Sequence, residues 1–236
     1  MPLLPENISK KISYHFPFKM KRMTLVLFPV GTSGYQLGRP AARLADLVVE
    51  AFQNRAECVT YLERENIQIS AHDWLFGHFE EKFAQQQTAL CAFHQNRLAH
   101  VVWASASAEA GRRLTWDPPV VLNWETSSIL SAAYTPDEFR GQRIFPFMLS
   151  EAAQYVQQLG FQNAYGAYGS DNIASKKGLQ KVNGQKIATC LRARIKIPKV
   201  RVISLAVLTW GQRSDGSRWY RRKFHELPDL HYIPLA

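Results

Sequence analysis

The chain has little cysteine. Its 236 residues include three cysteines, Cys58, Cys91 and Cys190, which lie far apart and are odd in number. Disulfide frameworks and zinc sites need cysteines in pairs or at short, regular spacings. Four histidines also lack a metal-ligand spacing: His72, His78, His94 and His100. We therefore expect three reduced, mostly buried thiols and no metal.

Long apolar runs and repeats are absent as well. No apolar segment approaches the roughly 18 residues of a membrane-spanning helix. The first residues lack the charged-then-apolar layout of a signal peptide, and the sequence contains no internal repeat or low-complexity tract. These absences favour a cytoplasmic protein without a transmembrane segment.

Acidic residues are scarce relative to basic ones. The chain has 19 Asp and Glu against 29 Lys and Arg, a formal net charge of +10. This excess fits polyanionic partners such as phosphorylated cofactors, nucleic acid or an anionic membrane surface. The apolar content of 46% and charged content of 20% are typical of a globular chain. The length fits one α/β domain with extensions.

The most informative stretch reads as a strand, a basic turn and a helix in succession. Ser128–Tyr134 is small, apolar and uncharged, which predicts a strand buried on both faces. Pro136 ends that strand because proline cannot donate to a sheet. Residues 139–143 form a short basic turn. Helical spacing of apolar residues then runs over 144–159, and Gly160 is a natural C-cap.

This turn has the chemistry of an anion-binding site. The first N–H groups of a helix lack internal partners and lie at the positive end of its dipole. Gly141 would let a phosphate approach the backbone, and Arg140 and Arg143 add positive charge. The alternative is an ordinary strand–helix connection with two solvated arginines. This segment alone does not decide between them.

A second strand–turn–helix unit follows. Residues 161–168 predict a strand, 169–172 a turn with N-cap chemistry, and 173–182 a helix that ends at Asn183-Gly184. This order of elements resembles the acetyl-CoA-binding half of the GNAT superfamily of N-acyltransferases. The resemblance covers about residues 86 to 197.

The motifs of the family are matched in part. The family turn reads Arg/Gln-x-x-Gly-x-Gly/Ala, and here Arg140 matches the leading position. Arg143 and Phe145 stand where the family has small residues. The downstream Asn-x-x-Ser pattern is matched by Asn172 and Ser175.

The resemblance implies an α/β fold with a mixed, mostly antiparallel central sheet, flanked by helices and with splayed central strands. Three prolines and the basic cluster of Lys19, Lys21 and Arg22 predict an extended arm over 1–23. The resemblance implies a single domain over 24–236. Within that domain, 24–86 would form the acceptor side, 87–197 the acyl-CoA-binding core and 198–236 the C-terminal strands. Acetyl-CoA or another acyl-CoA would be the co-substrate.

The cofactor diphosphate would lie on backbone N–H groups of about residues 142–147. The thioester carbonyl would bind a backbone N–H near Tyr134, where the central strands splay. The expected cofactor-binding residues are Tyr134, Thr135, Arg140, Gly141, Gln142, Arg143, Ile144, Phe145, Asn172 and Ser175.

Acyl transfer to an amine needs groups that accept and donate protons. Glu125 is the first candidate for the base because it shares strand parity with Ser131, the alternative being a surface carboxylate. The general-acid tyrosine of many family members falls at Leu179 here. Tyr134, Tyr165 and Tyr168 are substitutes unless they are core or edge aromatics, and we take Tyr168 as the catalytic candidate.

The remaining elements are predicted from periodicity and turn residues. We expect a first strand over 24–30, helices over 41–52 and 73–83, and a hairpin of 88–94 and 98–104 with Trp103 pointing inward. An extra strand over 120–122, strands over 191–197 and 200–208, and a hairpin turn over 212–218 complete the expectation.

The function that this sequence favours is acetyl transfer from acetyl-CoA to the primary amine of a small molecule, by direct attack in a ternary complex. Two alternatives stay open. One is a synthase of N-acyl amino acids or acyl-homoserine lactones that takes its acyl group from acyl-carrier protein. The other is a GNAT-like binding protein without catalysis. No helix-turn-helix or zinc motif supports nucleic-acid binding, and a homodimer is compatible with the sequence.

Overall fold

The structure, a computed structural model, describes residues 18–29, 40–67, 73–113, 122–196, 202–212 and 218–224. The strands are β1 (Phe18–Pro29), β2 (Val48–Phe52), β3 (Thr88–His94), β4 (Arg97–Ala104), β5 (Ser127–Tyr134), β6 (Asn163–Gly169), β7 (Gln185–Lys196), β8 (Val202–Gln212) and β9 (Arg218–Phe224). The helices are α2 (Arg55–Arg64), α3 (Asp73–Ala84), α4 (Ala108–Arg112), α5 (Ile144–Gln158) and α6 (Ile173–Lys181), with 3-10 turns η1 (Ala42–Leu44) and η2 (Asp137–Phe139).

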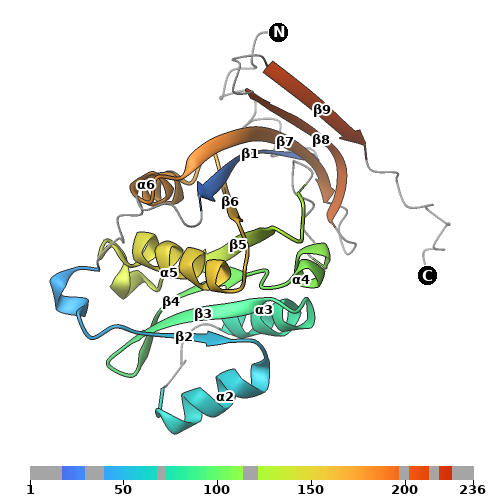
Figure 1. Cartoon of the computed structure of the whole chain (residues 1–236). Helices are drawn as coiled ribbons and strands as arrows, with labels where there is room; N and C mark the ends of the chain where they lie inside the picture. The colour runs from blue at the N-terminus through green and yellow to red at the C-terminus, as the bar shows by residue number, and fades with distance from the viewer. Residues whose placement is uncertain are drawn as a thin grey trace.

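The described strands form one sheet in the order β2-β3-β4-β5-β6-β1-β7-β8-β9 (Figure 1). β5 and β6 pair in parallel, whereas the other neighbouring strands pair antiparallel. Helices flank the sheet, with α5 lying across β4 and β5 in Figure 1. This arrangement confirms the fold class that the sequence predicts. None of the described helices combines the length and apolarity needed to cross a membrane.

The two parallel strands separate after a short paired segment. Their register runs from Ser127↔Asn163 to Leu130↔Gly166 and then stops. Ala132 has a φ of 47°, and the pairing of β5 with β4 shifts register at the same level. An irregularity of this kind bends one strand of a pair. From Ser131 onward β5 therefore follows β4 and splays away from β6.

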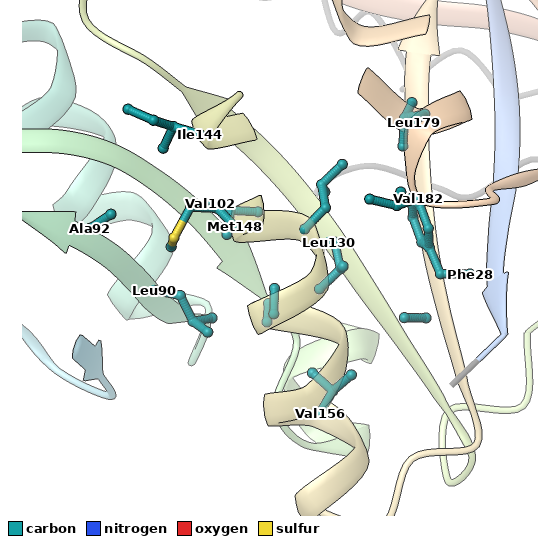
Figure 2. Packing of buried hydrophobic residues seen from close by; sticks show 14 of the residues in the cluster. Phe28, Leu90, Ala92, Val102, Leu130, Ile144, Met148, Val156, Leu179 and Val182 are labelled. Carbon is teal, nitrogen blue, oxygen red and sulfur yellow. The ribbon is translucent and has the colours of Figure 1, made fainter. Parts of the chain in front are cut away.

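α5 covers one face of the sheet because its apolar residues recur at helical spacing. Ile144, Met148, Ala152 and Val156 are buried and lie four residues apart. They share a core cluster with Leu130 and other sheet residues (Figure 2). Each large apolar side chain buried there contributes about 1.5–3 kcal/mol. This packing fixes where the helix begins relative to the end of β5.

A second hydrophobic core lies on the other face of the sheet, between the strands and helices α2 and α3. Trp103 is 2% exposed and stacks edge-on with Phe79 at a ring-centroid distance of 4.9 Å. Phe83 meets the same indole at 5.0 Å. The inward orientation predicted for Trp103 is confirmed. Cys58, Cys91 and Cys190 are buried free thiols, as expected.

Much of the predicted element order is confirmed. The helix expected over 73–83 is α3, the hairpin is β3 and β4, and the two strand–turn–helix units are β5 to α5 and β6 to α6. The tail strands correspond to β7 and β8. The predicted turn over 212–218 and the strand over 120–122 fall mainly outside the described residues, as do residues 1–17 of the predicted arm.

Four predictions of local structure are wrong. β1 begins at Phe18, six residues before the predicted strand start at Thr24. The helix expected over 41–52 is instead η1 followed by β2, which pairs with β3. Helix α2, capped by the Asn54 side chain, was not foreseen. In β5 the burial expected along the whole strand holds for Ser127–Leu130, and the second half is partly exposed.

Candidate functional site

The connection from β5 to α5 places two residues in the left-handed conformation. Gly141 has a φ of 76°, and Arg143, the residue before α5, has φ 63° and ψ 14°. Left-handed backbone costs a non-glycine residue about 1–2 kcal/mol. Arg143 stands where the GNAT pattern has glycine. The residue departs from that pattern, and the backbone adopts the conformation that glycine favours.

This turn is held in place by contacts on its other side. The Gln142 side chain donates a hydrogen bond from Nε2 to the Glu138 carbonyl at 2.8 Å. The Ala41 N–H donates to the Gln142 carbonyl at 3.1 Å. Phe139, the last residue of η2, is buried, and the Arg97 guanidinium lies 5.5 Å from the centre of its ring. Gln142 thus serves as an anchor of the turn, with its side chain buried.

Several backbone donors at the start of α5 are unused. Within the described part of the chain, no group accepts a hydrogen bond from the N–H of Gly141, Arg143, Ile144 or Phe145. Pro146 has no N–H. The Phe147 N–H donates to the Arg143 carbonyl at 3.3 Å, so the donor range expected over 142–147 ends at Phe145. Four N–H groups therefore remain available to an anion.

These donors border a cavity of about 500 Å³ between the end of β5 and the starts of α5 and α6. Nine of the ten predicted cofactor-binding residues line it: Tyr134, Thr135, Arg140, Gly141, Arg143, Ile144, Phe145, Asn172 and Ser175. The tenth, Gln142, faces the anchoring contacts instead. The structure thus brings together residues that the sequence separates by about forty positions.

The rim of the cavity is positively charged. Arg140, Arg143, Lys177 and Lys181 line it and are exposed. Arg140 pairs with Asp137 at 2.7 Å and donates from Nε to the Thr135 carbonyl at 3.1 Å. Among the described residues no carboxylate pairs with the other three cations. An anion entering here meets a positive field as well as free N–H donors.

The inner wall of the cavity is apolar and closely packed. A Cβ on Gly178 of α6 would lie 2.3 Å from Cδ1 of Phe145. The bulky Phe145, at a position where the GNAT pattern has Gly or Ala, is accommodated because α6 has a glycine opposite it. A glycine on α6 thus leaves room for a large side chain at the start of α5.

His100 of β4 also belongs to this wall, and the sequence did not single it out. Its side chain is fully buried, Nδ1 lies 2.7 Å from the Thr135 hydroxyl, and the ring centre lies 5.9 Å from that of Phe145. Burial lowers the pKa of His100 from 6.5 to about 3. The imidazole is therefore neutral at neutral pH. Strand alternation could have placed His100 on the α5 side, but not its contact with Thr135.

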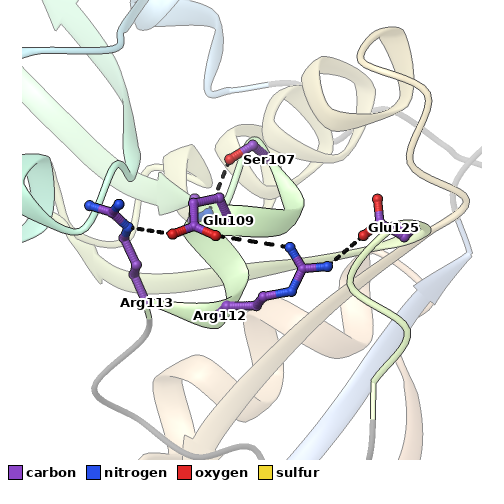
Figure 3. Close-up of polar contacts among 6 residues, drawn as sticks. Ser107, Glu109, Arg112, Arg113 and Glu125 are labelled. Carbon is purple, nitrogen blue, oxygen red and sulfur yellow. Dashed lines mark hydrogen bonds and ion pairs between the residues drawn. The ribbon is translucent and has the colours of Figure 1, made fainter.

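The structure does not bring Glu125 to the cavity. Glu125 precedes β5, whereas the cavity lies beyond its far end, roughly 25 Å away at about 3.3 Å per residue. Its side chain is 68% exposed and pairs with Arg112 at 2.5 Å. Figure 3 shows this pair continuing to Glu109 and Arg113. These contacts describe a surface ion-pair network.

Tyr168 does not line the cavity either. It lies on β6 opposite Thr24 of β1 and packs partly against the main core. Tyr134, by contrast, lines the cavity. Burial, followed by the Asp137 charge, raises the pKa of the Tyr134 phenol. Tyr134 is therefore held in its protonated form.

A lysine from the opposite face reaches the point where the strands part. Lys82, in the last turn of α3, donates from Nζ to the Ser131 hydroxyl at 3.5 Å. Ser131 is the first residue of β5 beyond its paired segment with β6. Burial lowers the pKa of Lys82. Lys82 could not be recognised from the sequence because the contact joins residues 49 positions apart.

In the described part of the chain, no three His, Cys, Asp or Glu side chains converge as metal ligands. No family model matches the sequence, and no curated protein matches it.

Some solved structures have a similar chain path. One is a conserved protein of unknown function from Staphylococcus epidermidis, with 10% identity, a TM-score of 0.49, and coverage of 81% of this chain and 67% of that one. An acetyltransferase of the GNAT family from Colwellia psychrerythraea has 12% identity, a TM-score of 0.44, and coverage of 72% and 53%. A tandem GNAT protein from the clavulanic acid biosynthesis pathway has 12% identity, a TM-score of 0.47, and coverage of 79% and 57%.

This chain thus spans little more than half of the latter two proteins. Identities this low concern the fold alone, and TM-scores below 0.5 add no argument about activity.

Proposed function

We propose that the protein is an acyltransferase that takes an acyl group from a CoA thioester, most simply acetyl-CoA, and transfers it to a primary amine of a small molecule. The observation that carries this proposal is the β5–α5 turn, where four described residues whose N–H groups have no acceptor line a cavity that has cations at its rim. Unpaired N–H groups at a helix start, together with the helix dipole, form a strong site for a phosphorylated ligand. The adjacent strand splay offers space for the acyl arm.

In this proposal the diphosphate lies on the N–H groups of Gly141, Arg143, Ile144 and Phe145. Lys177 and Lys181 of α6 supply charge to the phosphates. Asn172 caps α6 by accepting from the Ser175 N–H at 2.9 Å. Its amide nitrogen can donate to the pantetheine arm. The arm then runs along Tyr134 toward Ser131 at the splay.

The chemistry is a direct transfer in a ternary complex. The amine nitrogen forms a bond to the thioester carbonyl carbon, and the carbon–sulfur bond breaks. Lys82, in its neutral form, accepts the proton that the amine loses, and the Tyr134 phenol gives a proton to the leaving thiolate. The lowered pKa of Lys82 and the raised pKa of Tyr134 favour these two protonation states. This scheme gives no role to Glu125, which pairs with Arg112 before the start of β5, or to Tyr168, which packs partly against the main core.

The binding half of the proposal is tested by thermal unfolding and calorimetry with CoA, acetyl-CoA and ADP. A ligand that binds only the native state raises the melting temperature. CoA and acetyl-CoA should stabilise the protein more than ADP does. No stabilisation by any CoA compound at saturating concentration would rule out the proposed function.

A matched pair of variants locates the binding site. Gly141→Asp places a carboxylate at the cavity and should weaken CoA binding at least tenfold, because it repels phosphate near four N–H donors (1.4 kcal/mol per tenfold). Gly160→Asp is the control, since Gly160 also has a positive φ and open space around it but lies at the other end of α5. Equal losses of affinity in both variants would place the ligand elsewhere.

A second reading is favoured by one observation. The position of the family general acid holds Leu179, which is 5% exposed and part of the core. A protein that binds CoA without transferring its acyl group would fit this departure. Release of free thiol from acetyl-CoA in the presence of a panel of primary amines separates the two readings. Activity confined to acyl-carrier-protein donors would instead identify the carrier-dependent synthase.

A further inference from the structure

We propose that His100 is a ligand-binding residue of this cavity, and that its Nε2–H donates a hydrogen bond to an oxygen of the bound CoA compound. This inference rests on the proposed function. It adds a side-chain donor from β4 to a site otherwise built from the β5–α5 turn and α6.

The first observation is an unused polar atom. Nε2 of His100 is buried and has no hydrogen-bond partner among the described residues, although His100 lines the cavity. Buried polar atoms almost always have a partner, so an unpaired one calls for a water molecule or a ligand. Gln85, Gln87 and Thr189 also carry buried unpaired atoms, but they do not line the cavity.

The second observation is the orientation of the ring. Nδ1 lies 2.7 Å from the Thr135 hydroxyl, and Thr135 follows β5 directly at the cavity. A threonine hydroxyl can either donate or accept. When it donates to Nδ1, the proton of the neutral imidazole sits on Nε2. The neutral ring of this cavity-lining residue then carries an unpaired donor at Nε2.

The surroundings keep the imidazole neutral and suit a ligand of mixed polarity. The ring is fully buried, and this burial lowers the pKa of the imidazole. Phe139, Ile144 and Pro146 form a buried apolar wall beside it. A ligand that fits has anionic groups at the rim and a less charged part inside. Either a phosphate oxygen or a pantetheine amide oxygen can accept from Nε2.

Two variants of His100 separate the contribution of Nε2 from that of Nδ1. His100→Asn keeps a polar atom near the position of Nδ1, for Thr135, but lacks the atom that reaches the ligand. His100→Gln places an amide near the position of Nε2. By calorimetry His100→Asn should weaken CoA binding roughly tenfold, the value of one buried hydrogen bond, and His100→Gln should recover most of that loss. Thermal unfolding by circular dichroism checks that both variants fold.

The role of Nε2 can also be measured on the unmodified protein, without substitutions. Side-chain nitrogen NMR of the histidines reports the tautomer of His100 and the hydrogen bonding of Nε2. Saturation with CoA should shift the Nε2 resonance of His100. Titration with adenosine 3′,5′-bisphosphate and with pantetheine separates the two sources of oxygen, since the one that shifts Nε2 supplies the acceptor.

The outcomes distinguish this inference from the proposed function. If CoA binds, but Nε2 does not respond and His100→Asn binds equally well, then Nε2 meets a buried water only and the inference is overturned while the proposed function stands. If CoA does not bind the unmodified protein, both fail. If a variant does not fold, the NMR response decides alone.

Discussion

Arg143 combines two properties that usually belong to different residues. Its backbone is left-handed at the start of α5, and its guanidinium adds charge to the rim of the cavity. A glycine there would satisfy the backbone but remove the charge. In the proposed function, the conformational cost of arginine at this position, about 1–2 kcal/mol, accompanies a cation that contacts the bound phosphates.

We expect Arg143→Gly to stabilise the fold by up to about 1 kcal/mol, since the relief of left-handed strain exceeds the entropy that glycine adds to the unfolded chain. CoA affinity should fall because a cation is lost. Arg143→Ala is the control, with the same loss of charge and no relief of strain. Urea unfolding and calorimetry measure both effects. Equal stability of the two variants would contradict the strain argument.

His100 should make stability depend on pH. Its pKa is about 3 in the folded protein and 6.5 in the unfolded chain, so below pH 6.5 the unfolded state binds the extra proton. The contribution of His100 to the free energy of unfolding is therefore largest above pH 6.5. It falls as pH drops toward 3, by roughly 2 kcal/mol between pH 6.5 and 5. Urea unfolding at pH 7 and pH 5 should show a smaller loss for His100→Asn. An identical loss in both proteins would refute this assignment.

We expect opposite effects on kcat from substitutions of Lys82 and Glu125. Lys82→Met should lower kcat on the order of a hundredfold, the range for loss of a general base, and Glu125→Gln should leave it unchanged. In the unmodified protein kcat should fall as pH drops through the lowered pKa of Lys82, because a protonated amine accepts no proton. Steady-state kinetics with an active amine tests this. A large effect of Glu125→Gln alone would return the role of base to that residue.

At the scale of elements, α5 and α6 meet through one large and one small residue. Phe145 fits because Gly178 has no side chain. Gly178→Ala should destabilise the fold by about 1–3 kcal/mol through overpacking. In a Phe145→Ala background the same change should be stabilising by about 1 kcal/mol, since alanine favours helix over glycine.

A double-mutant cycle measured by urea unfolding gives the coupling energy between Phe145 and Gly178. We expect this coupling energy to have the opposite sign to the stability change caused by Gly178→Ala alone. Additive effects would show that the two residues do not contact. A further readout is CoA affinity, because a Phe145 ring displaced by Gly178→Ala would occupy part of the cavity.

The sequence predicted elements where the deciding chemistry is local. Pro136, Gly141 and the apolar spacing from Ile144 onward define the β5–α5 turn, and it formed as predicted. Over 41–52 the spacing of Leu44, Leu47 and Val48 imitates a helix, but pairing with β3 makes Val48–Phe52 an edge strand. The spacing of apolar residues does not reveal that a segment has a partner strand about forty residues away.

At the scale of the whole molecule, contacts between distant segments also limited the prediction of the candidate site. The residues of the turn and of α6 were predicted because each group belongs to a short local motif, Arg140–Phe145 and Asn172-x-x-Ser175. His100 and Lys82 were not, because β4 and α3 reach the site through sheet pairing and helix packing. Glu125 was chosen by strand parity, which gives the face of a sheet but not the position along it.

β1 has a consequence for how the molecule assembles. It pairs with β6 and β7, so a strand near residue 20 is completed by segments near residues 165 and 190. During synthesis this early strand must stay without its partners until most of the chain has left the ribosome. Since long-range pairing slows folding, we expect this half of the sheet, beside the proposed cofactor cavity, to form late.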